Sequence, residues 1–263
     1  MGIMNVNVEP HAEIEARKLA GLNKNSNVFT FEDFASIPVA STAASGGGAA
    51  TGADGDENLL AMGNNTFEYH CVEIQTILSP VQAAAGLDIG MDQTENDGLE
   101  VTQGITAAAK HAFTIGTDAA FYFRVLLNIA NVSGVDDCLV GFRLAEAYQK
   151  LVDGYNDMAA LNVISGAINI ETIVGGAATT TTDTTHTVDD GVDVDLTVIV
   201  GADGVVIYEI DGATPKTVAA FTLTDTIVVV PFLHYLHAGA PVGGVILVKE
   251  WECGFWTDKL PVI

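Results

Sequence analysis

From Thr66 to the C-terminus, short runs of β-branched and aromatic residues alternate with tight-turn dipeptides, and few folds accommodate this pattern. Ser165-Gly166 separates two such runs, and Asp211-Gly212 ends another. A glycine that follows serine or aspartate is typical of the turns that join antiparallel strands. No long helical segment lies between the runs, which argues against a parallel α/β sheet. The pattern predicts one large all-β domain, either a sandwich or a barrel.

The expected strands follow from these runs, and two segments interrupt them. We predict strands within residues 67–78, 121–130, 138–142, 158–164, 167–174, 195–200, 205–210, 217–223, 227–234 and 245–254. Residues 143–153 are rich in good helix formers, so we predict a short helix or an ordered loop there. The threonine-rich residues 179–187 are expected to form the exposed end of a hairpin.

The N-terminal part of the chain differs in composition from the rest. Residues 11–22 have helix-forming composition, and the small residues of 41–55 predict a flexible tether. Large apolar side chains are sparse here, and we expect them to contact a partner: Ile14, Leu19, Phe29, Phe31 and Phe34. We therefore divide the chain into an N-terminal arm, residues 1–66, and a β-sandwich domain, residues 67–263.

The charge of the chain is strongly one-sided, with 34 acidic and 10 basic residues and a formal net charge of -24. Such a surface repels phosphate groups, so neither a nucleic acid nor a membrane is an expected partner. The simplest role of this acidity is to keep the protein soluble. The N-terminal residues lack the basic start and long apolar run of a signal peptide, which predicts synthesis in a cytoplasm.

Three segments of the chain together resemble a known family. They are FYFRVLLNIANVSGVDDCLVGFR, EAYQKLVDGYNDMAALNV and VVVPFLHYLHAGAPVGGVILVKEWECGF, which lie within residues 121–255. In their order and pattern they resemble the concanavalin A-like (laminin-G-like) β-sandwiches of virion structural proteins in tailed phages. The resemblance spans the half of the chain within those limits and includes no catalytic signature.

The resemblance implies an antiparallel β-sandwich of jelly-roll topology with an extended N-terminal arm. It also implies a capsid decoration or cement protein that binds the major capsid protein on the outer face of the head shell. Such proteins are homotrimers or homodimers, are made in the host cytoplasm and have no enzymatic activity. In this interpretation the arm clasps the shell, and Trp256 is a further interface anchor.

The main alternative is a carbohydrate-binding module that attaches a virion to glycans on the host surface; a tail or fibre component is another. A lectin-like site needs exposed aromatic side chains against which sugar rings stack. The candidates are Tyr148, Tyr155, Tyr235, Trp251 and Trp256. Most of them lie in runs with the alternation of a buried strand, so we expect most of them in the core.

A glycosidase is the third hypothesis, because sandwiches of this type include retaining enzymes with an E-x-D-x-x-E strand. Glu209 and Asp211 begin that pattern, but Thr214 stands at the third position, so no catalytic residue is assigned. Glu250 and Glu252 lie on one face of a predicted strand and Trp251 on the other. We interpret the two glutamates as solvated charges beside a core tryptophan.

Metal binding has weak support in the sequence, and no cofactor is expected. Related sandwiches often hold a structural calcium ion, for which Asp136, Asp137, Asp189 and Asp190 are the candidates. Asp193 and Asp195 extend the second acidic group, but neither group has the spacing of a dedicated calcium loop. His234 and His237 are three residues apart, so on a strand they face opposite sides and do not share a metal.

The three cysteines do not make a disulfide framework. Cys71, Cys138 and Cys253 are expected to be buried, reduced thiols. A single bridge between Cys71 and Cys253 is the alternative, if their strands are neighbours.

Overall fold

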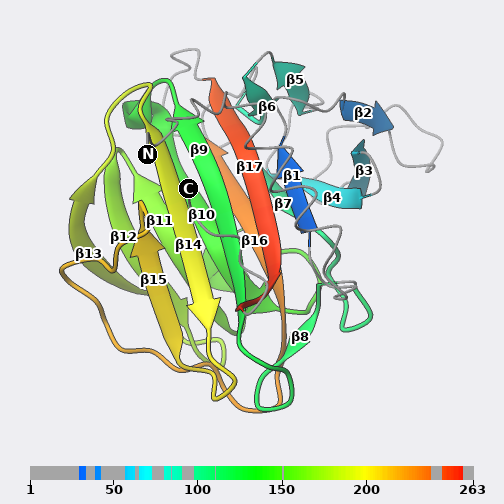
Figure 1. Ribbon diagram of the computed structural model, residues 1–263, viewed down its shortest axis with the longest axis vertical. Helices are drawn as coiled ribbons and strands as arrows, with labels where there is room; N and C mark the ends of the chain where they lie inside the picture. Colours follow the sequence, from blue (N-terminus) through cyan, green and yellow to red (C-terminus); the bar gives the residue numbers. More distant parts are fainter. Residues whose placement is uncertain are drawn as a thin grey trace, which may run out of the picture.

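The computed structural model describes residues 30–33, 39–42, 57–62, 65–72, 80–83, 85–90, 98–109, 111–149, 151–237 and 245–256. Before residue 83 the described side chains are those of Phe67, His70 and Pro80. The described chain forms two β-sheets, one behind the other in Figure 1, where β14, β9 and β17 lie in front.

Sheet A has the strand order β15-β14-β9-β17-β6-β5, and β1 also pairs with β17. Its strands are β1 (Thr30–Asp33), β5 (Val81–Ala83), β6 (Gly86–Asp88), β9 (Phe121–Ile129), β14 (Asp193–Val200), β15 (Val206–Ile210) and β17 (Ile246–Phe255).

Sheet B has the order β13-β12-β11-β10-β16-β7-β4-β3-β2, and β8 also pairs with β16. Its strands are β2 (Val39–Thr42), β3 (Glu57–Met62), β4 (Asn65–Val72), β7 (Gly98–Thr102), β8 (Phe113–Thr114), β10 (Val135–Leu144), β11 (Met158–Ile164), β12 (Ala167–Ile173), β13 (Thr180–Thr187) and β16 (Val228–His237). Every pairing between described strands is antiparallel, so the prediction of an antiparallel β-sandwich is confirmed.

Alternation along each strand places one set of side chains between the sheets. On β9, Phe121, Phe123 and Val125 are fully buried in the main hydrophobic core, whereas Tyr122 and Arg124 face the other side of sheet A. The core is built largely from aromatic and β-branched residues, which suit the pleated surface of a strand. Sequence alternation therefore fixes which side chains remain on the outer faces.

Both predicted tight turns are present. Ser165 and Gly166 have φ values of 47° and 87°, and Asp211 and Gly212 have values of 52° and 74°. Positive φ at both central residues is the geometry of a type I′ turn, whose twist matches that of the strands it joins. Ser165-Gly166 connects β11 to β12, and Asp211-Gly212 follows β15.

For one segment the structure selects between two expected alternatives, and two other expectations differ from the structure. Residues 143–153 form no helix: Arg143 and Leu144 end β10, and the only helical turn of this segment is the 3-10 turn η2, Val152–Gly154. The ordered-loop alternative therefore holds. Residues 217–223 are not a strand, because they run beside β15 with a single bridge between Val205 and Thr222. Residues 179–187 are not a hairpin tip, because β13 pairs with β12 and ends sheet B.

Part of the predicted N-terminal arm joins the sheets. β1 pairs with β17, with Phe31 opposite Glu252, and β2 and β3 extend sheet B beyond β4. The predicted helix at 11–22, with Ile14 and Leu19, lies outside the described residues, as do Phe29, Phe34 and residues 43–55 of the tether. No helix in the described part of the chain is long and apolar enough to cross a membrane.

One core side chain carries a polar group that the core does not satisfy. Tyr208 of β15 is fully buried, and its hydroxyl has no hydrogen-bond partner in the described structure. A buried hydroxyl without a partner costs about 1–3 kcal/mol of desolvation.

We therefore expect Tyr208→Phe to leave the free energy of unfolding unchanged or to raise it by about 1 kcal/mol, because it removes only the unsatisfied group. The matched control is Tyr155→Phe, which deletes a hydroxyl that donates to Glu100. That variant should lose about 1.5–3 kcal/mol, as expected for a hydrogen bond to a charged group. Urea unfolding of both variants measures the difference, and a destabilised Tyr208→Phe protein would contradict the interpretation.

Candidate functional site

A row of polar side chains crosses the outer face of sheet B, the face turned away from the main core. Cross-strand register aligns the row over seven strands, and its described side chains are His70, Glu100, His234, Leu139, Asn162, Asn169 and Asp183. Leu139 is the only apolar member. On β12, Ile168 and Ile170 enter the main core, so Asn169 and Glu171 face outward.

The loop between β10 and β11 covers one part of this row. This cover loop comprises residues 145–149 and 151–157 of the described chain. Val152 and Tyr155 of the loop pack against apolar residues of the outer face in a second hydrophobic cluster, with Leu139, Met158, Ala160, Ile173 and Phe232. The Tyr148 ring stacks on His70, with centroids 4.8 Å apart and planes 11° apart. The cover loop is therefore held at both ends of its path.

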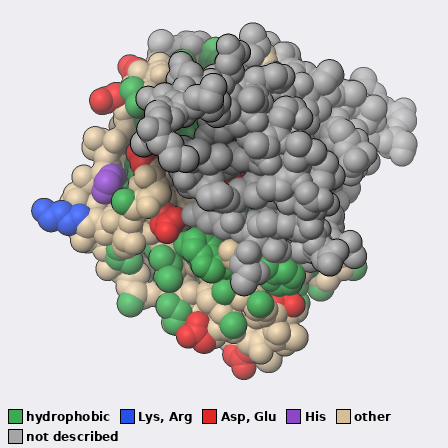
Figure 2. All heavy atoms as spheres, in the orientation of Figure 1, with side chains coloured by type: hydrophobic (Ala, Val, Ile, Leu, Met, Phe, Trp, Pro, Cys, Tyr) green, Lys and Arg blue, Asp and Glu red, His purple; other side chains and the backbone are tan. Residues whose placement is uncertain are grey.

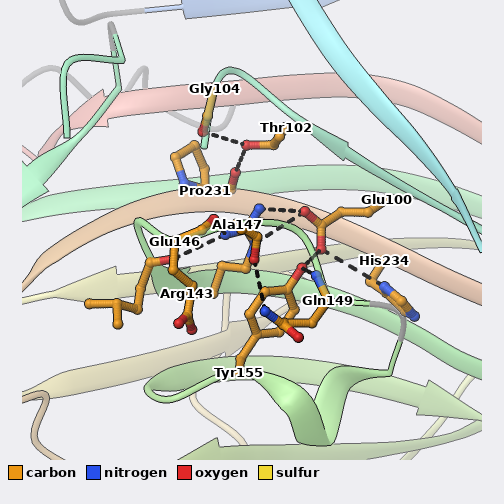
Figure 3. Close-up of polar contacts among 11 residues, drawn as sticks. Glu100, Thr102, Gly104, Arg143, Glu146, Ala147, Gln149, Tyr155, Pro231 and His234 are labelled. Carbon is orange, nitrogen blue, oxygen red and sulfur yellow. Dashed lines mark hydrogen bonds and ion pairs between the residues drawn. The ribbon is translucent and has the colours of Figure 1, made fainter. Parts of the chain in front are cut away.

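Glu100 is the centre of the contacts beneath the cover loop (Figure 3). One carboxylate oxygen of Glu100 accepts two hydrogen bonds from Arg143, one from Nη2 at 2.6 Å and one from Nε at 3.1 Å. The other accepts the Tyr155 hydroxyl at 2.6 Å, and Nδ1 of His234 lies 3.9 Å away. Both charged side chains are fully buried, and Arg143 also donates from Nη1 to the carbonyl oxygens of Leu144 and Glu146.

This arrangement keeps Glu100 ionised although it is buried. Burial by itself would raise the pKa of Glu100. The Arg143 guanidinium, the nearby His234 imidazole and the hydrogen bond from Tyr155 outweigh it and lower the pKa to about 2. Glu100 and Arg143 are fully buried and bonded to each other, to Tyr155 and to backbone carbonyls, so they anchor the cover loop and are not available to a ligand.

Beyond the cover loop, the outer face carries amide and carboxylate groups that are less occupied. We call this the amide–carboxylate face and define it by Asp137, Asp153, Asn162, Asn169, Glu171 and Thr181. Asn162 donates from Nδ2 to Asp137 at 2.6 Å and accepts the backbone N–H of Cys138 at 2.9 Å. Thr181 approaches Glu171 at 3.4 Å, and Asp153 accepts the Thr179 hydroxyl.

Asn169 is the least satisfied member of the face. Its side chain is 8% exposed, and its amide makes no hydrogen bond to any residue in the described part of the chain. The neighbouring Asn162 and Glu171 point to the same side, as their register requires. A buried amide normally finds partners, so this one is available to a ligand.

A bulge lies next to Asn169. The pairing of β12 with β13 shifts register between Ile168 and Asn169, and Thr185 of β13 has a φ of 65°. The buried Thr184 hydroxyl donates to the carbonyl oxygen of Ile168 and stabilises this irregularity. Bulges re-aim side chains and occur often beside functional sites.

Three carboxylates of the face have no basic partner in the described structure. Burial raises the pKa of Glu171, and the nearby charges of Asp137 and Asp153 add to the effect. The pKa of Asp137 is also raised, first by burial and then by Asp136 and Asp153, although Asn162 and His234 oppose this. The ionised forms of Asp137 and Glu171 are therefore disfavoured in the folded protein.

The outer face of sheet A carries a different polar cluster. Arg124 contacts Asp195 at 2.7 Å, Glu250 at 2.6 Å and Glu252 at 3.5 Å, and Tyr122 donates to Glu252. The prediction that Glu250 and Glu252 are solvated edge charges is wrong. β17 lies inside the sheet, and Arg124 on the neighbouring β9 pairs with both glutamates. Trp251 does face the core, as alternation predicted.

The predicted calcium residues do not form a metal site in the described structure. The two acidic loops are neighbours, because the Val132 N–H donates to Asp190, but Asp136 and Asp189 are exposed. Among the described residues, no three acidic, histidine or cysteine side chains converge as metal ligands would. His234 contacts Glu100 on the outer face, whereas His237 accepts or donates a hydrogen bond with the core residue Tyr235, so the prediction of opposite faces is confirmed.

The aromatic candidates and the cysteines are mostly core residues. Tyr155, Tyr235 and Trp251 are buried, as is expected from their alternation. Trp256 is 37% exposed and packs edge-on against Tyr122.

Cys138 and Cys253 are both buried, and burial raises the pKa of the Cys138 thiol to about 12. The Cys71 side chain lies outside the described ones, so its pairing stays undecided.

Two comparisons with known proteins found nothing: no family model matches the chain, and no curated protein matches it. Among solved structures, the carbohydrate recognition domain of Emp46p in its potassium-bound form matches with 7% identity and a TM-score of 0.50. The match covers 73% of this chain and 89% of that domain. The fold is thus a concanavalin A-like antiparallel β-sandwich, as the resemblance implied.

Other solved structures are more distant in shape. A protein of unknown function from Shewanella oneidensis MR-1 matches with 14% identity and a TM-score of 0.47, over 100% of this chain and 99% of that one. A galectin from Caenorhabditis elegans matches with 13% identity and a TM-score of 0.34, over 54% of this chain and 89% of that one.

Glu100→Gln should destabilise the protein by about 3–5 kcal/mol at neutral pH, because it leaves the buried Arg143 charge without its partner. The folded pKa of Glu100, about 2, lies below the ordinary 4.5. Its contribution is therefore complete above the ordinary value and is lost as the pH falls through the folded value. Urea unfolding over that range should show the difference between variant and wild type shrinking with acid. A difference that does not change with pH would contradict the ion-pair explanation.

Glu171→Gln should change the free energy of unfolding in the opposite direction and make the protein more stable at neutral pH. A carboxyl whose pKa is raised in the folded state costs stability as the pH rises through that pKa, so the ionised form is unfavourable at neutral pH. The amide keeps the contact with Thr181 and removes the charge. Urea unfolding should give a higher free energy at neutral pH, and the gain should vanish in acid. Destabilisation at neutral pH would show that the Glu171 charge has a stabilising partner.

Proposed function

We propose that this protein is a carbohydrate-binding module that binds glycans on the amide–carboxylate face of sheet B. The observation that carries the proposal is Asn169, an amide that is 8% exposed and makes no hydrogen bond to the described residues. It lies in register between Asn162 and Asp183, on the side of the sheet that bears Glu171.

The chemistry of the face suits a sugar. Each sugar hydroxyl both donates and accepts a hydrogen bond, and an amide side chain does the same in a fixed plane. Ionised carboxylates accept hydrogen bonds from hydroxyl groups and strengthen them through their charge. A few convergent polar groups on a rigid surface are what a small-ligand site requires.

The frame around the face is rigid before any ligand arrives. Asn162 is held by Asp137 and by the Cys138 backbone, and the cover loop that borders the face is anchored through Glu100. Side chains that are already fixed lose little conformational entropy on binding. The proposed mechanism is therefore recognition on a preformed surface, with no covalent step.

The comparison with Emp46p supports the proposal at the level of the fold. That domain is named a carbohydrate recognition domain, and it shares the sandwich over most of its own length. The shared fold supplies a scaffold on which sugar-binding sites occur, and the site itself has to be argued from the residues of this chain.

The role of a capsid decoration protein stays a prediction, because it rests on the resemblance of residues 121–255 alone. Four further points also stay predictions. They are that the protein lies on the virion, that it forms a homo-oligomer, that it binds the major capsid protein, and that it has neither enzymatic activity nor a cofactor. A glycan-binding sandwich on a virion surface would promote adhesion to the host, so the two roles are compatible.

Screening of the full chain against a glycan array tests the proposal. We expect binding to a defined set of glycans, and we expect Asn169→Ala to weaken it about tenfold, the effect of losing one or two hydrogen bonds. The control is Asp203→Asn, in an exposed turn of sheet A, where the amide oxygen still accepts the Val205 N–H. Absence of binding, or undiminished binding by a folded Asn169→Ala protein, would overturn the proposal.

A further inference from the structure

The strongest clue to the kind of glycan is the charge of the amide–carboxylate face. We infer that its ligand is a cationic glycan, an oligosaccharide of amino sugars whose amines are protonated, such as an oligomer of glucosamine. This inference rests on the proposed function and narrows its ligand class.

The first argument is the absence of a positive partner. Asp137, Asp153 and Glu171 form no ion pair in the described structure, whereas the carboxylates of sheet A share Arg124. Burial and mutual repulsion raise the pKa of both Asp137 and Glu171. A ligand that brings positive charge relieves this repulsion, and one that brings negative charge increases it.

The second argument is the balance of hydrogen-bonding groups. Asn162 uses one N–H on Asp137 and its oxygen on the Cys138 backbone, and it also interacts with Glu171, so it contributes little more to a ligand. Beyond the hydrogen bonds already named, the face presents mainly acceptors: the second oxygens of Asp137, Asp153 and Glu171, and the Asn169 amide. A protonated amine has three donors and no acceptor, so it matches this set better than a hydroxyl does.

The third argument is the spacing of the carboxylates. The described residues contain no group of three acidic, histidine or cysteine side chains close enough to hold one metal ion. Carboxylates spread over two strands and the cover loop, Asp137, Glu171 and Asp153, suit an extended cation with several amines. The Asn169 amide between them favours a sugar over a polycation that lacks hydroxyl groups.

The net charge of the whole chain also favours a cationic ligand. This charge of -24 attracts cationic ligands and repels sulfated or acidic glycans. On the side of sheet A, which Figure 2 shows, acidic side chains appear at several places on the described surface and basic ones at a single place. This attraction acts over about 8 Å at physiological salt, so binding should weaken as the salt concentration rises.

Calorimetric titration of the full chain tests the inference with three oligosaccharides of equal length. They are a glucosamine oligomer, its fully N-acetylated counterpart and a uronic acid oligomer, all at a pH where the amines are protonated. We expect the glucosamine oligomer to bind at least about tenfold more tightly than the N-acetylated one, with a preference that salt removes. The uronic acid oligomer should not bind.

Variants separate the charge from the sugar contacts. Asp137→Asn and Glu171→Gln should each weaken binding of the glucosamine oligomer about tenfold, as for a lost charge-assisted hydrogen bond. Their affinity for the N-acetylated oligomer should fall by less than this, because the carboxamide oxygen of each variant still accepts hydrogen bonds from sugar hydroxyls. Asp203→Asn removes the same charge from the exposed turn of sheet A and should change neither affinity.

The outcomes distinguish this inference from the proposed function. Equal affinity for the glucosamine and N-acetylated oligomers would overturn the inference and leave the carbohydrate-binding module standing. No binding of either, together with a silent glycan array, would overturn both. An oligolysine peptide of equal charge that binds as tightly as the glucosamine oligomer would also overturn the inference, because the face would then recognise charge without sugar.

Discussion

The buried ion pair between Glu100 and Arg143 decides how the outer face of sheet B is divided. Placing both charges away from water is costly, and the structure offsets this with a two-nitrogen contact, the Tyr155 hydroxyl and two backbone carbonyls. These partners belong to the strands and to the cover loop alike. The ion pair therefore fixes the loop over one part of the polar row, next to the amide–carboxylate face.

The amide–carboxylate face depends on the register between strands that are distant in the sequence. Asp137, Asn162 and Asn169 come from three consecutive strands, and a shift of one residue in any pairing would turn its side chain into the core. The isoleucines on either side of Asn169 oppose such a shift, because they would then face outward. The main core and the proposed site are thus fixed by the same alternation.

Local patterns predicted much of the fold but little of the site. The turns at Ser165-Gly166 and Asp211-Gly212 need only their own dipeptides. In contrast, Arg124 pairs with Glu250, which is 126 positions away, and no local pattern announces such a contact. Asn169 and Glu171 alternate with isoleucines in the sequence, a pattern typical of a strand with one polar face, but their position near Asp137 depends on the strand order. Residues 217–223 have strand-like composition, yet in the fold they make only one bridge to the edge of β15.

The bulge beside Asn169 has a second effect, on how copies of the protein meet. β13 ends sheet B, and an edge strand that is straight and apolar invites another strand to pair with it. Here the edge is kinked at Thr185 and carries Asp183 and His186, so its unpaired backbone groups do not form an even ladder. Crowded molecules therefore have little tendency to fuse into fibrils through this edge.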